Sequence, residues 1–156
     1  MRIFALETST ERLSLALLAD GRMFERDIDA GQRHSDLALP LIREIFAEAC
    51  IAISDLDAIA FGQGPGSFTG VRIACGLAQG MAFGAGLGMI PVQTQMTMAE
   101  QCAVDRVLVA LDARVIHGSL DDFHQLARLC LVKDETHYDR FDLAFKHFFE
   151  GIQSFA

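Results

Sequence analysis

A glycine-rich loop is the segment of this sequence with the clearest potential for chemistry. Residues 62–73 read Gly-Gln-Gly-Pro-Gly-Ser-Phe-Thr-Gly-Val-Arg-Ile and join an apolar run at 58–61 to a stretch of small residues at 69–85. Backbone amides at the start of a helix can bind an anion, and glycine lets a ligand approach the backbone closely. Gly64, Gly66 and Ser67 are therefore candidate anion-binding residues. The loop is not a Walker A motif, because no Lys precedes a Ser or Thr after its last glycine.

A second candidate lies at residues 7–9, at the end of a predicted first strand. Glu7, Thr8 and Ser9 place a carboxylate beside two small hydroxyls, a combination that meets magnesium and phosphate in actin-like ATPases. The alternative is a turn that satisfies its own hydrogen bonds. We favour this alternative, because the chain offers no matching second phosphate loop with a carboxylate.

No catalytic or metal-binding constellation is complete. His34 lacks a partner at helical spacing, since residue 38 is Ala, so a surface or capping role is expected for it. No Gly-x-Ser-x-Gly elbow is present, which disfavours a serine hydrolase. The four cysteines are widely spaced without a CxxC motif, which favours reduced core residues.

The stretch at 69–85 predicts a helix with a flat side. Gly76, Gly80 and Gly84 recur every four residues, although each glycine costs a helix about 1 kcal/mol relative to alanine. That cost is explained if another helix must approach closely. Ser67 or Thr69 is expected to cap this helix. The stripe therefore favours a surface for protein contact over a catalytic or ligand-binding site.

Composition narrows the class of protein. The chain has 156 residues, 51% of them hydrophobic and 22% charged, which is typical of one globular domain. A net charge of −8 disfavours direct nucleic-acid binding, which needs clustered Lys and Arg. The uncharged stretch 73–92 is long enough to span a membrane, but its five glycines, Gln79 and Pro91 favour a soluble helix, a turn and a strand. No signal peptide is visible, and a cytoplasmic location is expected.

The predicted elements follow an α/β order. Strands are expected at 2–6, 12–19 and 22–29, with a hairpin turn at Asp20-Gly21. A helix follows over 35–50, capped by Ser35, with one apolar face that comprises Leu37, Leu41, Ile45 and Ala49. Strand and helix then alternate through a last buried strand at 106–111. A meander followed by alternating elements predicts a single ribonuclease-H-like or actin-like lobe with a mixed sheet.

Beyond residue 114 the pattern changes to two amphipathic helices, which form a C-terminal tail. The first is expected from the apolar residues between 120 and 131, including Cys130 and Leu131, and the second from an aromatic stripe between 138 and 149. The tail is expected to pack on itself or on the lobe. The domain boundaries are thus 1–114 for the lobe and 115–156 for the tail.

Several of these segments together resemble TsaB, also called YeaZ, a family of bacterial tRNA threonylcarbamoyladenosine biosynthesis proteins. The resemblance covers about residues 1–114 and rests on these motifs: Met-Arg-Ile-Phe-Ala-Leu-Glu-Thr-Ser-Thr (1–10), His34-Ser35 with Leu39-Pro40, the loop at 62–73, Gly-Leu-Ala-Gln-Gly (76–80), Thr-Met-Ala (97–99) and Ala-Leu-Asp-Ala-Arg (110–114). It implies an actin-like fold and a role in forming N6-threonylcarbamoyladenosine at position 37 of tRNAs that read codons beginning with A.

The resemblance also implies partners. Members of the family are degenerate paralogues of the transferase TsaD; they bind TsaD through helices of this lobe, form homodimers, and join complexes that recruit the ATPase TsaE. It implies no catalytic residue, no metal and no cofactor of the chain's own, with ATP and magnesium entering only through the partner complex. The older peptidase M22 assignment is not supported. The metal site of TsaD uses a His-x-x-x-His pair, and this chain has Ala38 at the position of the second histidine. The expected interface comprises Leu37, Leu41, Glu44, Arg72, Ile73, Gly76, Gly80, Phe83 and Gly84.

The chain departs from the family after residue 114, where a second lobe is expected. Residues 115–156 instead resemble the N-terminal region of CoxE-like von Willebrand factor A proteins. Two other interpretations stay open: an actin-like ATP hydrolase that uses Glu7, Thr8, Ser9 and the loop at 64–69, and a truncated or chimeric chain that has lost its partners.

Overall fold

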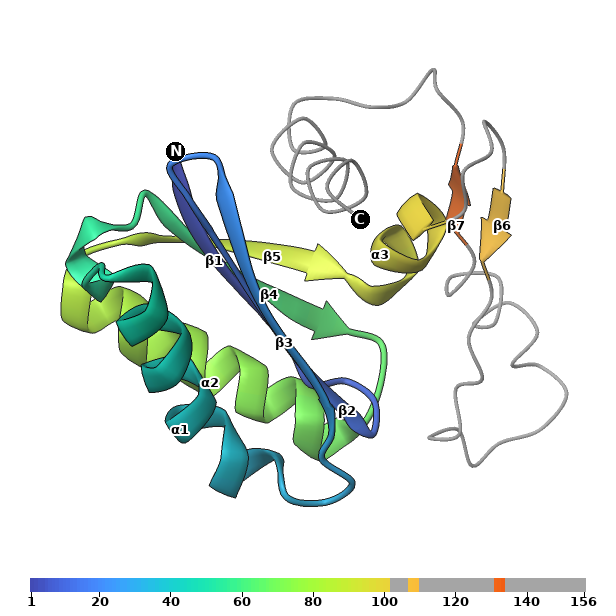
Figure 1. Ribbon diagram of the computed structural model, residues 1–156. Coiled ribbons are helices and arrows are strands. Elements are labelled where there is room, and N and C mark those ends of the chain that lie inside the picture. The colour runs from blue at the N-terminus through green and yellow to red at the C-terminus, as the bar shows by residue number, and fades with distance from the viewer. Residues whose placement is uncertain (102–106, 110–130, 134–156) are drawn as a thin grey trace, which may run out of the picture. The chain divides into compact units, whose positions relative to one another are not determined.

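The computed structural model describes residues 1–101, 107–109 and 131–133, and the chain divides into two compact units, Met1–Val92 and Gln93–Ala156 (Figure 1). The first unit contains five strands, two α-helices and a short 3-10 helix. They are β1 (Arg2–Glu7), β2 (Arg12–Ala19), β3 (Arg22–Asp29), α1 (His34–Ala49), η1 (Ile53–Asp55), β4 (Ala58–Gly64), α2 (Phe68–Ala85) and β5 (Gly88–Gln93).

The first unit is a mixed sheet with both helices on the same face (Figure 1). The strand order is β3-β2-β1-β4-β5; β1 pairs antiparallel with β2, β2 antiparallel with β3, and β1 parallel with β4. Asp20 and Gly21 have φ angles of 53° and 80°, as the predicted two-residue hairpin requires. The predicted α/β fold class is confirmed for this unit.

The core lies between the sheet and the two helices. Strand β2 alternates buried and half-buried side chains after its first residue, so the period-2 pattern of its leucines is confirmed. The rings of Phe4 on β1 and Phe46 on α1 lie with their centroids 5.3 Å apart, a favourable tilted packing.

Helix α1 buries a different face from the predicted one. The buried apolar residues are Ala38, Ile42, Ile45 and Phe46, whereas Leu37, Leu41 and Ala49 are only partly buried. A strict i, i+4 ladder drifts around a helix by about 40° per step, so the face that stays on the sheet mixes steps of three and four. The predicted cap Ser35 was also wrong, because the helix begins at His34 after Arg33.

His34 is a packing residue. It is 6% exposed, and its Nε2 lies 3.1 Å from the carbonyl oxygen of Arg12 on β2. The expectation of a surface or capping histidine was wrong, since the ring bridges the start of α1 to the sheet.

Helix α2 has the predicted ends. The Ser67 hydroxyl accepts a hydrogen bond from the Gly70 N–H at 3.3 Å, and Gly86 closes the helix in the left-handed conformation at φ 67°. Within the part of the chain that is described, no helix is long and apolar enough to cross a membrane.

The second unit holds α3 (Thr94–Gln101), β6 (Val107–Val109) and β7 (Leu131–Lys133). Strands β6 and β7 pair antiparallel in a two-stranded sheet of their own, so the last predicted strand does not join the main sheet. Leu131 was predicted in a helix, which was wrong. A short apolar run is compatible with a helix or a strand, and here pairing with β6 makes it a strand. The rest of the predicted two-helix tail lies outside the described residues.

A surface ion pair on the sheet predicts a dependence of stability on pH. Arg12 donates to both oxygens of Asp27, at 2.9 Å from Nε and 2.7 Å from Nη2, and this bond holds the pKa of Asp27 below its ordinary value. A lowered folded-state pKa stabilises the fold above the unfolded-state pKa, near 4, and this contribution disappears as pH falls through the folded value. We expect Asp27→Asn to reduce the acid-induced loss of unfolding free energy slightly, because the pair is exposed.

Urea unfolding between neutral pH and about pH 3 measures this effect. Glu25→Gln, which changes an exposed carboxylate of the same strand, is the matched control. If Asp27→Asn loses as much unfolding free energy at low pH as the unaltered chain, the Arg12–Asp27 pair does not contribute to the acid dependence.

Candidate functional site

The glycine-rich loop packs against the turn that follows β1. The Cα of Gly62 faces the carboxylate of Glu7, that of Gly70 faces the carbonyl oxygen of Thr8, and a Cβ built on Gly66 would lie 2.5 Å from Ser9 Cβ. A side chain at Gly66 or Gly70 would collide with the turn, and one at Gly62 would meet the Glu7 side chain at the end of β1. Gly66 and Gly70 are explained by close approach of two backbone segments.

Hydrogen bonds join the same two segments. The Thr8 hydroxyl donates to the carbonyl oxygen of Gly70 at 2.7 Å, and the Ser67 N–H donates to the carbonyl oxygen of Ser9 at 2.7 Å. Thr8 is fully buried and Ser9 is 3% exposed. The polar groups at this junction therefore bind one another.

The structure thus brings the predicted anion-binding residues together at one junction. Glu7 Oε1 accepts the Ser9 N–H at 2.5 Å, and Gly64 adopts a φ of 90° before a cis bond to Pro65. Gly66 and Ser67 lie where the loop meets Ser9. The bond between Ser9 and Glu7 is local, as in a turn that satisfies its own hydrogen bonds, whereas the bonds of Thr8 and Ser9 to Gly70 and Ser67 join segments far apart in sequence.

The predicted contact surface lies on the outer side of α2. A Cβ built at Gly76, Gly80 or Gly84 would meet no atom within 4 Å, so this side is open along about two turns. Phe83, between two of these glycines in sequence, is 93% exposed. The opposite side of the helix buries Gly70, Ala74, Ala78 and Ala82.

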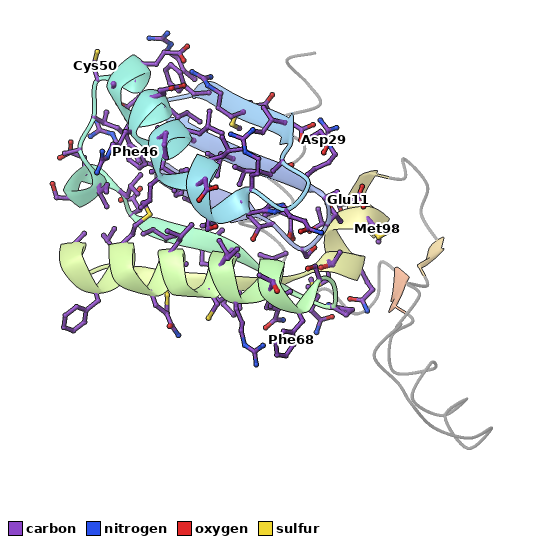
Figure 2. The ribbon with its side chains drawn as sticks, turned by 90° about the horizontal axis from the view of Figure 1, so that it is seen from below. Glu11, Asp29, Phe46, Cys50, Phe68 and Met98 are labelled. Atoms are coloured by element: carbon purple, nitrogen blue, oxygen red, sulfur yellow. The ribbon has the colours of Figure 1, made fainter. Side chains whose placement is uncertain are left out.

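A cation and an aromatic ring occupy the first turns of the same helix. Phe68 is 65% exposed, and the Arg72 guanidinium carbon lies 3.3 Å from the centroid of its ring. Figure 2 shows Phe68 at the start of α2, pointing outward. Arg72 is the only charged residue of α2.

Sequence reasoning had not included Phe68 in the surface. Its position in the sequence indicates the contact: Phe68 follows the capping Ser67 and precedes Arg72 by four residues, and side chains four residues apart on a helix lie next to each other. We name the surface formed by Phe68, Arg72, Gly76, Gly80, Phe83 and Gly84 the α2 face.

The other predicted interface residues divide by burial. Glu44 is exposed on α1, whereas Leu37 and Leu41 on α1 and Ile73 on α2 are half-buried. Leu37 and Leu41 pack against the core cluster, so part of their surface is already used. Among the described residues, no group of three or more His, Cys, Asp or Glu side chains is placed to hold a metal ion.

Comparison with known proteins gives the family. The sequence model of TsaD, described as tRNA N6-adenosine threonylcarbamoyltransferase, matches residues 28–122. The chain belongs to this family.

Individual relatives place the chain with TsaB, or YeaZ, within it. The chain is 44% identical over 119 residues to the tRNA threonylcarbamoyladenosine biosynthesis protein TsaB of Escherichia coli, which covers 74% of this chain and 52% of that protein. It is 43% identical to TsaB of Haemophilus influenzae over 74% of this chain and 50% of that protein. The resemblance drawn from the sequence motifs is confirmed.

A solved structure confirms the fold of this family. YeaZ from Pseudomonas aeruginosa superposes with a TM-score of 0.70 at 42% identity, over 73% of this chain and 55% of that protein. The chain thus spans about half the length of the relatives it matches. The predicted resemblance of residues 115–156 to von Willebrand factor A proteins falls almost entirely outside the described residues.

Proposed function

We propose that this protein takes part in the biosynthesis of N6-threonylcarbamoyladenosine in tRNA. The names of its TsaB relatives, at 43–44% identity, and the fold shared with YeaZ support this role. The motif at 62–73 lies inside the range matched by the family model, and with the residues after β1 it forms the junction at the start of α2.

Within that pathway, the proposed activity is docking of a TsaD-type transferase on the α2 face. The observation that carries this proposal is the open glycine stripe, where added side chains would meet no atom within 4 Å. Glycine stripes let two helix backbones approach closely. The exposed Phe83 and Phe68 supply the aromatic anchors that dominate binding at interfaces.

The charge of the α2 face defines what its partner must offer. Arg72 is the only charge on the helix, and it lies at the end occupied by Phe68. A complementary helix has small or apolar residues opposite the glycines and a carboxylate opposite Arg72. Glu44, exposed on α1, is suited to contact at the polar rim of such an interface.

A non-catalytic role fits the junction beside α2. An ATP hydrolase of actin type is the alternative, with Glu7, Thr8 and Ser9 around phosphate and magnesium. The Thr8 hydroxyl and the Ser67 N–H instead bind Gly70 and Ser9, so a phosphate would have to displace internal bonds. Stabilisation by millimolar magnesium ATP in a thermal melt would favour the hydrolase; an unchanged melting temperature would favour the partner subunit.

The proposed complex is tested by mixing the purified chain with its cognate TsaD-type transferase and separating the mixture by size-exclusion chromatography with light scattering. A one-to-one complex is expected. In the same experiment, the molar mass of the chain alone shows whether it forms a homodimer. Adding a TsaE-type ATPase tests whether a ternary complex forms. Separate peaks for chain and transferase would favour the third interpretation, a truncated or chimeric chain that has lost its partners.

Phe83→Asp is expected to abolish this complex while leaving the fold intact. Phe83 is 93% exposed, so its side chain contributes little to stability, whereas a buried aromatic anchor contributes about 2 kcal/mol or more to binding. Met89→Asp, at a 40% exposed position of β5, is the matched control and should bind normally. Equal affinity of Phe83→Asp and the unaltered chain would place the interface elsewhere.

A further inference from the structure

Three consecutive residues, the last of β1 and the first two of the turn that follows, each meet one glycine of β4, the loop or α2. Glu7 lies against Gly62, Ser9 against Gly66 and Thr8 against Gly70. We name these six residues the turn–helix clamp. The glycines are four residues apart in sequence, but only Gly70 belongs to α2. The clamp therefore spans the end of β4, the loop and the first turn of α2.

The clamp holds the start of α2 at two points. The Ser9 carbonyl oxygen accepts the N–H of Ser67, the N-cap residue, at 2.7 Å. The Thr8 hydroxyl donates to the Gly70 carbonyl at 2.7 Å. Phe68 lies in sequence between these two attachment points.

Thr8 supplies a contact that the helix does not supply itself. The carbonyl of a helical residue accepts the amide four positions on, and its second lone pair is then free for another donor. Thr8 uses that lone pair from a fully buried position. Its hydroxyl consequently ties the first turn of α2 to the sheet without competing with the helix.

We infer that Thr8 is a positioning residue for the α2 face. Its hydroxyl fixes the first turn of α2 and thereby the direction in which the stacked Phe68 and Arg72 pair is presented to the docking partner. The binding part of this inference rests on the proposed function. The part that concerns the helix does not.

Thr8→Val tests the inference, because valine keeps the shape of threonine and removes the donor. Thr8→Ser keeps the donor and serves as the rescue variant. Thr10→Val makes the same substitution two residues away, where the hydroxyl is exposed and accepts the Arg12 N–H instead. All variants of the full chain are compared well below the lowest melting temperature. If Thr8→Val does not fold, Thr8→Cys, with its weaker donor, replaces it.

The first readout is hydrogen exchange of the backbone amides of α2 in the chain alone. In Thr8→Val, exchange at residues 71–74 is expected to accelerate about fivefold to tenfold, the effect of one lost hydrogen bond, with no change at 82–86. Thr8→Ser and Thr10→Val should match the unaltered chain. Uniform acceleration along α2, or none, would overturn the inference.

The second readout is affinity for the TsaD-type transferase. Thr8→Val is expected to weaken binding about fivefold, and Thr8→Ser to restore it. Local acceleration of exchange with undiminished affinity would overturn the role of Thr8 in binding. If the unaltered chain binds no transferase, the proposed function fails, and the exchange data still decide whether Thr8 positions the helix.

Discussion

Gly70→Ala is expected to destabilise the first unit strongly, by about 3 kcal/mol or more. A Cβ at this position would fall well inside van der Waals contact with the Thr8 carbonyl oxygen. That oxygen belongs to the backbone of a buried turn, so it cannot rotate away as a flexible side chain would. Either the turn after β1 or the start of α2 must move, and both are held by the turn–helix clamp.

Gly76→Ala is the matched control for this prediction. It places the same substitution in the same helix, where a Cβ meets no atom within 4 Å. Removing a glycine from the helix interior is expected to stabilise the unit by about 0.5–1 kcal/mol. Urea unfolding followed by far-UV circular dichroism measures both changes. Equal effects of the two substitutions would contradict the close approach at Gly70.

Gly80→Leu is expected to stabilise the isolated chain and to weaken its complex. Position 80 is open, and leucine is a better helix former than glycine by about 0.8 kcal/mol. In a closely packed helix pair the added side chain has no room, which costs about 1–3 kcal/mol of binding free energy, or about 5-fold to 150-fold in Kd. The two effects have opposite signs, so loss of binding cannot be attributed to unfolding.

Gly88→Leu provides the control for this second substitution. Gly88 begins β5, and a Cβ there also meets no atom within 4 Å, but it lies outside the α2 face. It should leave the dissociation constant for the transferase unchanged, as measured by calorimetry or light scattering. If Gly80→Leu binds as tightly as Gly88→Leu, the glycine stripe is not the docking surface.

The structure gives the glycines before and within the first turn of α2 an explanation that the sequence did not offer. Gly66 and Gly70 leave room for the turn after β1 and Gly62 for the Glu7 side chain, whereas Gly76, Gly80 and Gly84 leave an open side on α2. Residue type alone does not distinguish the two sets. The difference is whether another backbone segment lies opposite each Cα, and that segment, residues 7–9, is more than fifty positions away in the chain.

Local rules were sufficient where neighbours in sequence determine conformation. The hairpin at Asp20-Gly21, the Ser67 cap, the end of α2 at Gly86 and the alternation of β2 follow from turn chemistry, capping and periodicity. The glycine stripe of the α2 face was predictable for the same reason, since residues four apart share one side of a helix, whereas Phe68 was not predicted as part of it.

Local rules failed where packing between distant segments chooses among alternatives. Leu37 and Leu41 have the character of core residues, but α1 turns Ala38 and Ile42 toward the sheet. Leu131 is as compatible with a helix as with a strand, and β6 pairs with it. The structure divides into compact units after Val92. The predicted domain boundary at residue 114 lies outside the described residues and stays a prediction.

The family, the order of strands and helices in the first unit and the outward stripe on α2 can be inferred from the sequence, because motifs, turns and helical periodicity depend on residues close together in the chain. The burial of His34, the register of α1 on the sheet and the pairing of Thr8 with Gly70 depend on contacts between residues far apart in sequence. Each of these contacts joins segments that are distant in the chain, so rules that relate neighbouring residues do not predict them.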